Sequence, residues 1–172
     1  MKSLLISMLL KNLIRYISKD KKNIIISGIS TDSKKIKKNY IFFAIRGNKL
    51  DGNNFIDEAI KKGANIIVTE NKLSKKKSNI IFLYSKNPRK LLSQVCYKIF
   101  NKKPKSLVAV TGTNGKSSIA DFYYQILNLN FKKVASIGTI GVKYKDKKQL
   151  LTNTTLDPIQ LSSIFEYLKK RK

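Results

Sequence analysis

The sequence has no histidine, no tryptophan, a single cysteine and only 10 acidic residues among 172. Without histidine there are no histidine metal ligands, no Ser-His or Cys-His catalysis and no ordinary neutral-pH general base. The lone Cys96 cannot form an intrachain disulfide, which fits a reducing compartment. Because Cys96 lies in the apolar-periodic segment LLSQVCYKIF, we expect it to be buried as a small hydrophobic side chain.

Long hydrophobic runs are also lacking, because none approaches the roughly 20 residues that a membrane-spanning helix needs. The N-terminal apolar segment is interrupted by Lys11 and Arg15 and has no small-residue cleavage site, so it does not predict a signal peptide. Its apolar residues recur at helical spacing and predict an amphipathic helix packed on the domain: Leu5, Leu9, Leu13 and Ile17. These features predict a cytoplasmic protein without membrane insertion.

Charge is strongly one-sided, with 36 basic residues and a formal net charge of +26. Such a charge suggests a polyanionic partner such as nucleic acid. The lysines are nevertheless spread along the whole chain beside Ile and Asn, which are amino acids of A/T-rich codons, and aromatic residues do not interleave with the basic runs in an RNA-binding pattern. We therefore favour base composition as the cause and predict no specific nucleic-acid partner. The alternative predicts retention on DNA and heparin that falls steeply with salt.

Apolar runs and amphipathic segments alternate in the first part of the chain. Strands are predicted within residues 23–30, 39–47, 65–70 and 79–85, and helices within residues 55–64 and 87–100. This alternation predicts an α/β fold with a sheet that is at least partly parallel. The polar, proline-containing segment 101–106 is predicted to connect this domain, residues 1–103, to a second one, residues 104–172.

The second domain is predicted to begin with a strand at Leu107–Thr111, a loop at Gly112–Lys116 and a helix to about Asn128. A strand within residues 132–140, a hairpin around Lys145–Lys148 and a helix capped by Asp157 are expected to follow. A parallel phosphate-loop domain needs about five strands to cover its helices. We therefore expect this domain to be truncated and poorly packed, and a C-terminal domain to be absent.

The stretch LVAVTGTNGKSS has the components of a phosphate cradle. Glycines let backbone N–H groups converge on an anion, and the start of a helix adds partial positive charge. Lys116 would then reach the β- and γ-phosphates, and Ser117 would bind Mg²⁺. The general pattern G-x-x-x-x-G-K-[ST] is not met, because Val110 stands where its first glycine belongs. The competing interpretation is a strand-to-helix turn that uses glycine for geometry only.

This departure resembles the ATP loop of the Mur ligases, the amide-forming enzymes of peptidoglycan synthesis, and of the related folylpolyglutamate synthetases. Thr111–Ser118 match the family loop T-G-T-N-G-K-[ST]-[ST] at every position. The resemblance implies that Lys116 is catalytic and that Ser117 holds Mg²⁺. It also implies an ATP-binding set of Gly112, Thr113, Asn114, Gly115, Lys116, Ser117 and Ser118.

A second block, in the first domain, resembles the same family's N-terminal domain. Its elements are Asp32-Ser33-Lys34, residues 39–47 and residues 51–59, with Lys34 in place of the usual Arg and Asn39 in place of the usual Gly. That domain holds the uridine diphosphate end of the substrate. The resemblance assigns UDP contacts to Thr31, Ser33, Asn48, Lys49 and Leu50. The plain alternative for Asp32 and Ser33 is turn chemistry after a strand.

A third block, NTTLDPIQLSSIF, is similar to the T-T-x-[DE]-P-x-x-L segment of the MurE branch, which adds the third residue of the stem peptide. It implies that Asn153, Thr154 and Thr155 contact the muramoyl-peptide substrate. The implied reaction joins diaminopimelate, or lysine, to UDP-N-acetylmuramoyl-L-alanyl-D-glutamate through an acyl phosphate, with ATP and Mg²⁺, in a monomer.

Parts that this reaction requires are missing from 172 residues, so we expect the chain to be inactive alone. The alternatives are a non-catalytic UDP-sugar-binding remnant, the ligase that adds D-alanyl-D-alanine, and a folylpolyglutamate synthetase.

Overall fold

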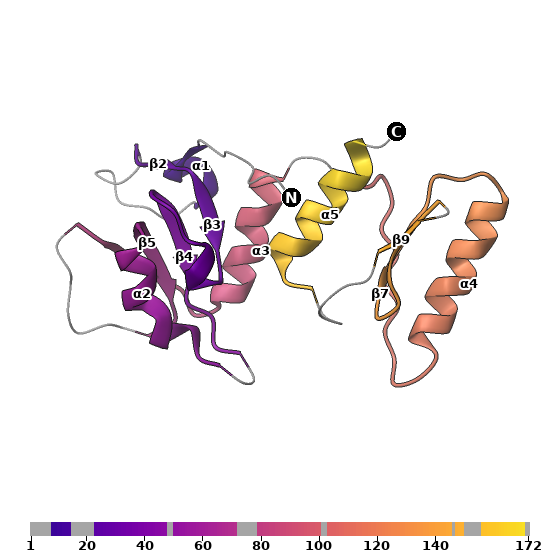
Figure 1. The fold of residues 1–172 in the computed structure, drawn as a ribbon, viewed down its shortest axis with the longest axis horizontal. Coiled ribbons are helices and arrows are strands. Elements are labelled where there is room, and N and C mark those ends of the chain that lie inside the picture. The colour runs from indigo at the N-terminus through magenta and orange to yellow at the C-terminus, as the bar shows by residue number, and fades with distance from the viewer. Residues whose placement is uncertain are drawn as a thin grey trace. The chain divides into compact units, whose positions relative to one another are not determined.

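A computed structural model of the chain describes residues 8–14, 23–47, 50–71, 79–100, 103–145, 147–149 and 156–170. The chain divides into two compact units, Met1–Ile99 and Phe100–Lys172. Figure 1 labels their elements along the chain, and each unit is described by itself.

Unit 1 is built on a parallel sheet, as the alternating pattern predicted. Its strands are β3 (Gly28–Ser30), β4 (Tyr40–Phe43), β5 (Ala64–Thr69) and β6 (Ile81–Tyr84), paired in chain order and all parallel. The central strands β4 and β5 are mainly apolar, and Phe42, Phe43 and Ile67 are fully buried. Continuous apolar runs of this kind are typical of a sheet covered on both faces.

Two helices cover this sheet. Helix α2 (Ile56–Lys61) follows the 3-10 helix η3 (Gly52–Phe55), and its Ile56 and Ala59 join a core that also contains Phe42 and Ile67. Helix α3 (Pro88–Ile99) packs against β4 and buries Leu92, Val95 and Cys96. The burial of Cys96, which is 1% exposed, confirms the prediction made for it.

The N-terminal segment differs from the predicted amphipathic helix. Met8–Leu9 form strand β1, antiparallel to β2 (Ile25–Ile26), and helix α1 is the single turn Leu10–Leu13. The prediction was therefore wrong at Met8–Leu9, because a neighbouring strand edge offers these residues backbone partners that helical spacing cannot reveal. Leu5 and Ile17 lie outside the described residues. Leu13 is buried as expected, and its carbonyl accepts a 3.0 Å hydrogen bond from Lys98 of α3.

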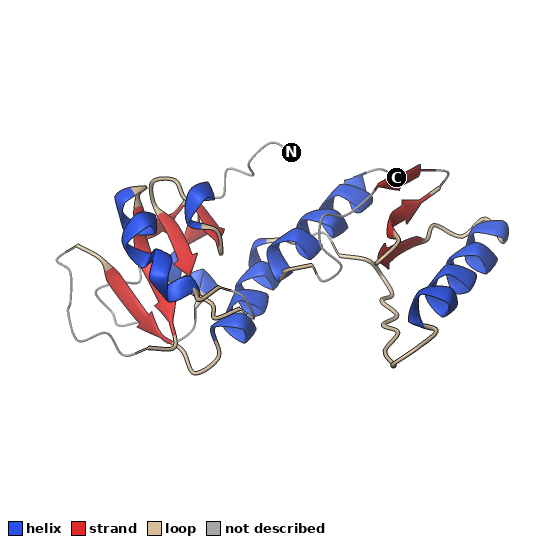
Figure 2. Ribbon diagram, turned by 60° about the horizontal axis from the view of Figure 1, so that its bottom comes forward, coloured by secondary structure: helices blue, strands red, loops and turns tan. Residues whose placement is uncertain are grey.

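Unit 2 contains helix α4 (Lys116–Leu129), an antiparallel sheet and helix α5 (Pro158–Lys170). The strands of the sheet are β7 (Ala135–Gly138), β8 (Gly141–Tyr144) and β9 (Lys147–Gln149), drawn in red in Figure 2. The hairpin predicted around Lys145–Lys148 is confirmed by the pairing of β8 with β9. Asp157 caps α5 as expected, because its Oδ1 accepts a 2.7 Å hydrogen bond from the N–H of Gln160.

The strand predicted at Leu107–Thr111 is wrong. These residues pair with no strand in the described part of the chain, and the side chains of Leu107 and Val108 are 69% and 59% exposed. A lone apolar segment cannot satisfy its backbone groups as a strand without a neighbour. Helix α4 has an exposed apolar face, which is made by Ile119, Phe122, Tyr123, Ile126 and Leu129.

The helices that the structure describes include none that is both long enough and apolar enough to cross a membrane.

Candidate functional site

The glycine-rich loop of unit 2 ends directly on a helix. Gly115 precedes the first residue of α4 in the left-handed region at φ 73°, and Gly112 has φ 149°. A Cβ at Gly115 would meet no atom within 4 Å, so glycine is required there by backbone conformation and not by space. The loop thus leads directly into the N-terminus of α4, where free N–H groups attract an anion.

Lys116 folds back over this loop. Its Nζ donates hydrogen bonds to the carbonyl oxygens of Gly112 and Thr113, the latter at 2.9 Å. The loop residues from Thr111 to Ser118 are exposed to solvent, so a large anion can approach them. Because phosphate oxygens carry charge and carbonyl oxygens do not, a phosphate can draw the ammonium away from its two carbonyl partners.

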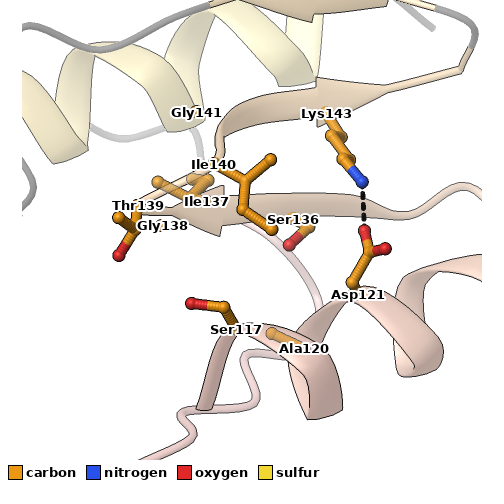
Figure 3. Close-up of a pocket in the computed structure, with 10 residues that line it drawn as sticks. All are labelled: Ser117, Ala120, Asp121, Ser136, Ile137, Gly138, Thr139, Ile140, Gly141 and Lys143. Atoms are coloured by element: carbon orange, nitrogen blue, oxygen red, sulfur yellow. Dashed lines mark hydrogen bonds and ion pairs between the residues drawn. The ribbon is translucent and has the colours of Figure 1, made fainter. Parts of the chain in front are cut away.

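Ser117 lies on the side of α4 that faces the sheet of unit 2. It lines a small pocket with Ala120 and Asp121 of α4 and with the turn between β7 and β8 (Figure 3). The cavity volume is about 20 Å³, enough for about one water molecule and far too small for a nucleotide. A nucleotide bound by this loop would therefore lie on its exposed outer side.

Asp121 is the acidic residue nearest to Ser117 along α4, and its carboxylate is already engaged. Its Oδ1 forms an ion pair with Lys143 of β8, which Figure 3 marks, and its Oδ2 accepts a 2.8 Å hydrogen bond from Gln125. The ion pair with Lys143 and the 2.6 Å bond from the Tyr124 hydroxyl to the carbonyl of Lys145 join α4 to the hairpin. We therefore assign Asp121 a structural role.

Ser117 fits Mg²⁺ chemistry, because this ion is usually held by few protein oxygens together with phosphates and water.

Three of the residues predicted to contact UDP, Thr31, Ser33 and Leu50, lie after the carboxyl ends of strands of the parallel sheet in unit 1. Thr31 directly follows β3, Ser33 begins the 3-10 helix η2 (Ser33–Lys35), and Leu50 ends the loop that follows β4. The carboxyl ends of parallel strands meet at one edge of a sheet, which is where α/β sheets bind their ligands. Leu50 is 68% exposed, whereas Ser33 is only 5% exposed.

The loop that leads from β4 to α2 is fixed at its base. The N–H of Gly47 donates to the carbonyl of Leu50 at 2.9 Å, and Arg46 and Asp51 form an isolated antiparallel bridge. Asp51 Oδ1 accepts hydrogen bonds from the backbone and the side chain of Asn53, at 2.9 and 2.7 Å. These two bonds hold the pKa of the Asp51 carboxyl below its ordinary value of 3.8.

Asn53 links this loop to the end of β5, because its Oδ1 accepts a 2.6 Å hydrogen bond from the hydroxyl of the buried Thr69. The sequence interpretation missed both Asn53 and Thr69. The signal for Asn53 was its position two residues after Asp51, which is the spacing of a side chain that caps a turn. No local pattern indicates Thr69.

Ser33 is paired with a residue that the sequence interpretation also missed. Its hydroxyl donates a 2.7 Å hydrogen bond to Oε2 of Glu58 on α2. This bond is the largest cause that lowers the pKa of Glu58 below its ordinary value of 4.5, followed by the hydrogen bond from Lys62. Asp32 caps η2 by accepting a 2.9 Å bond from the N–H of Lys34, which is the turn chemistry that its neighbourhood predicted.

Five of the predicted site residues lie outside the described residues: Asn48, Lys49, Asn153, Thr154 and Thr155. Their assignments stay predictions, as do the individual UDP and ATP contacts of the other residues.

Two family models match the chain. A model described as "Mur ligase family, catalytic domain" matches residues 25–103, and one described as "Mur ligase middle domain" matches residues 110–172. Together they cover most of both units.

Curated relatives carry the name UDP-N-acetylmuramoyl-L-alanyl-D-glutamate–2,6-diaminopimelate ligase. The protein from Rickettsia prowazekii is 40% identical over 151 residues, which are 88% of this chain and 30% of the relative. Ligase 2 from Clostridium acetobutylicum is 34% identical over 162 residues, which are 91% of this chain and 33% of the relative. The chain thus spans about a third of the length of these relatives.

A solved structure of a ligase with the same name superimposes with a TM-score of 0.79 and 23% sequence identity, over 96% of this chain and 34% of that one. A MurF structure from Acinetobacter baumannii has a TM-score of 0.50 and 21% identity, over 73% of this chain and 28% of that one. At these identities the superpositions establish the fold, and the family follows from the two models and the curated relatives. The chain belongs to the Mur ligase family, whose members are ATP-dependent amide-bond ligases, and its relatives are MurE-type enzymes.

Proposed function

We propose that the chain supplies the UDP-substrate-binding domain and the ATP loop of a MurE-type ligase. The reaction adds the third stem residue, 2,6-diaminopimelate, to UDP-N-acetylmuramoyl-L-alanyl-D-glutamate. The observation that carries this proposal is the T-G-T-N-G-K loop, which ends on the N-terminus of α4 with the Lys116 ammonium held above its carbonyls. The names of the curated relatives support the choice of substrates.

The loop residues have a defined task in this reaction. Amide formation requires activation of the substrate carboxylate as an acyl phosphate, which the amine of the incoming amino acid then attacks. Negative charge spreads over the phosphoryl group during its transfer, and fixed positive groups lower the barrier. Lys116 and the N–H groups at the start of α4 supply such charge. Mg²⁺ held at Ser117 would neutralise further phosphate charge.

Unit 1 has the task of holding the UDP end of the substrate. Thr31 and Ser33 follow the end of β3, and Asn48, Lys49 and Leu50 come after β4 in the sequence. Asn153, Thr154 and Thr155 would contact the muramoyl-peptide part. We propose a cytoplasmic monomer without a specific nucleic-acid partner.

Turnover is best tested in a chimera, because the chain spans about a third of its relatives. The chimera joins this chain to the remaining residues of the Rickettsia prowazekii ligase. ADP release that requires both UDP-N-acetylmuramoyl-L-alanyl-D-glutamate and 2,6-diaminopimelate is the expected activity. Lys116→Ala should abolish it while leaving UDP-substrate binding intact, and the exposed Lys133→Ala is the matched control. Turnover that survives Lys116→Ala would contradict the role of the loop.

A further inference from the structure

The pair formed by Ser33 and Glu58 restricts what Ser33 can offer to a ligand. A serine hydroxyl has one proton to donate and two lone pairs that accept. The proton of Ser33 is committed to Glu58 Oε2, with 2.7 Å between the two oxygens, and Ser33 is 5% exposed. Any third group that meets the Ser33 oxygen must therefore donate a hydrogen bond to it.

Glu58 cannot exchange this role with Ser33, because it is held as a carboxylate. Its Oε1 lies 3.1 Å from the ammonium of Lys62, the residue that caps the C-terminus of α2, and Lys34 of η2 adds positive charge nearby. These three partners, Ser33, Lys62 and Lys34, all favour the ionised form. An ionised carboxylate only accepts hydrogen bonds, so the direction of the Ser33–Glu58 bond is fixed.

The groups of a nucleoside diphosphate differ in how they can meet a fixed acceptor. Phosphate oxygens only accept, and ribose hydroxyls can either donate or accept. The N3–H group of uracil only donates. Cytosine has a bare lone pair at N3, which would face the lone pairs of Ser33 without a proton between them. A fixed acceptor therefore distinguishes a uracil ring from a cytosine ring, whereas a freely rotating hydroxyl would accept both.

We propose that Glu58 is a specificity-determining positioning residue, which holds Ser33 as an acceptor for the N3–H group of a uracil ring. The inference rests on the proposed binding of UDP by unit 1. It goes beyond UDP binding by explaining base selectivity. That selectivity comes from Ser33 of η2 and Glu58 of α2, which are 25 positions apart in the chain.

The test measures the dissociation constants of UDP and CDP by isothermal titration calorimetry on the whole chain. We expect the wild type to prefer UDP by about 10-fold or more, which is the effect of losing one hydrogen bond at a largely buried acceptor. Glu58→Ala frees the Ser33 proton, so CDP binding should improve and the preference should fall to about 3-fold or less. Asp57→Ala is the matched control, because it removes a neighbouring carboxylate of α2 and leaves the Ser33–Glu58 bond in place.

The ratio of the UDP and CDP dissociation constants distinguishes a role of Glu58 in base selectivity from a role in folding stability. A structural role for Glu58 predicts that Glu58→Ala weakens both ligands equally and leaves the ratio unchanged, which would overturn the inference. If circular dichroism shows that Glu58→Ala does not fold, Ser33→Ala decides, because alanine accepts no hydrogen bond and should also abolish the preference. A preference retained in Ser33→Ala overturns the inference while UDP binding stands. Failure of the wild type to bind UDP overturns the proposed function of unit 1 and this inference together.

Discussion

The hydroxyl of Thr69 donates a 2.6 Å hydrogen bond to Oδ1 of Asn53, which joins the end of β5 to the 3-10 helix that precedes α2. Thr69 is 1% exposed, so its side of this bond is shielded from water. The same Asn53 holds Asp51 at the base of the β4–α2 loop. One buried hydroxyl therefore supports the loop that is proposed to contact UDP.

Thr69→Val should destabilise unit 1 by about 1–3 kcal/mol, because it leaves the Asn53 amide oxygen without its donor. It should also weaken UDP binding, since the loop loses its anchor. Urea unfolding followed by circular dichroism and UDP titration would measure the two effects. Thr69→Ser keeps the hydroxyl and serves as the control, and a valine variant that behaves like the serine variant would show that the bond contributes nothing.

Gly115→Ala should weaken ATP binding and fray the start of α4, because a non-glycine residue at φ 73° costs about 1–2 kcal/mol. Gly138→Ala is a matched control, since an added Cβ meets no atom within 4 Å at either glycine and only Gly115 has a positive φ. Binding of a fluorescent ATP analogue and amide hydrogen exchange of α4 provide the readouts. Equal effects of the two substitutions would argue against a conformational requirement at Gly115.

Acid should destabilise unit 1 through Glu58 and Asp51. Both carboxyls have pKa values in the folded protein below their ordinary values of 4.5 and 3.8. The unfolded chain therefore takes up protons first as the pH falls, so the stability that these groups contribute is present above those values and is lost below them. We expect urea midpoints that are insensitive to these two groups between pH 6 and 8 and that fall below about pH 4.5.

The variant Ser33→Ala should have a smaller acid-dependent loss than the wild type, because it removes the largest cause of the lowered Glu58 pKa. An identical pH profile in Ser33→Ala and the wild type would contradict the assignment of that loss to Glu58.

The exposed apolar face of α4 should make unit 2 bind hydrophobic dyes and unfold without a sharp transition of its own. Phe122→Lys and Ile126→Lys replace side chains that are 62% and 59% exposed, so they should raise solubility without loss of helix. Tyr124→Lys is the contrasting variant, because Tyr124 is buried and donates to the carbonyl of Lys145. A cooperative unfolding transition of residues 104–172, or no gain in solubility, would contradict this prediction.

Local patterns predicted the elements whose contacts are local or whose partners follow closely in the chain. The apolar run at β5 and the amphipathic segment at α3 each contain the information for their own structure. The segment Leu107–Thr111 has the composition of a strand and still forms none, because a strand also requires a neighbour. Met8–Leu9 show the opposite behaviour. They lie in a segment with helical spacing, but pairing with β2 makes them a strand.

The turn from the glycine-rich loop into α4 was predictable, because the residues that determine its backbone conformation are continuous in Gly112–Ser118. Glu58 and Thr69 were not predictable, because each acts on a residue that is 25 or 16 positions away. The spacing of residues within a single helix or strand carries no information about a contact with a residue in another element. Their roles follow from the pairing of β3, β4 and β5, which brings η2, η3 and α2 to the same region of unit 1.

The order of the strands in unit 1 has a consequence for how the chain is made. Each of β4, β5 and β6 pairs with the strand that was synthesised immediately before it. A sheet of this order needs no late strand to insert between earlier ones, so the entropy of closing long loops is small at every step. Unit 1 can therefore add one strand at a time as the chain leaves the ribosome, and the surface around Ser33 can form before the phosphate loop of unit 2 has been translated.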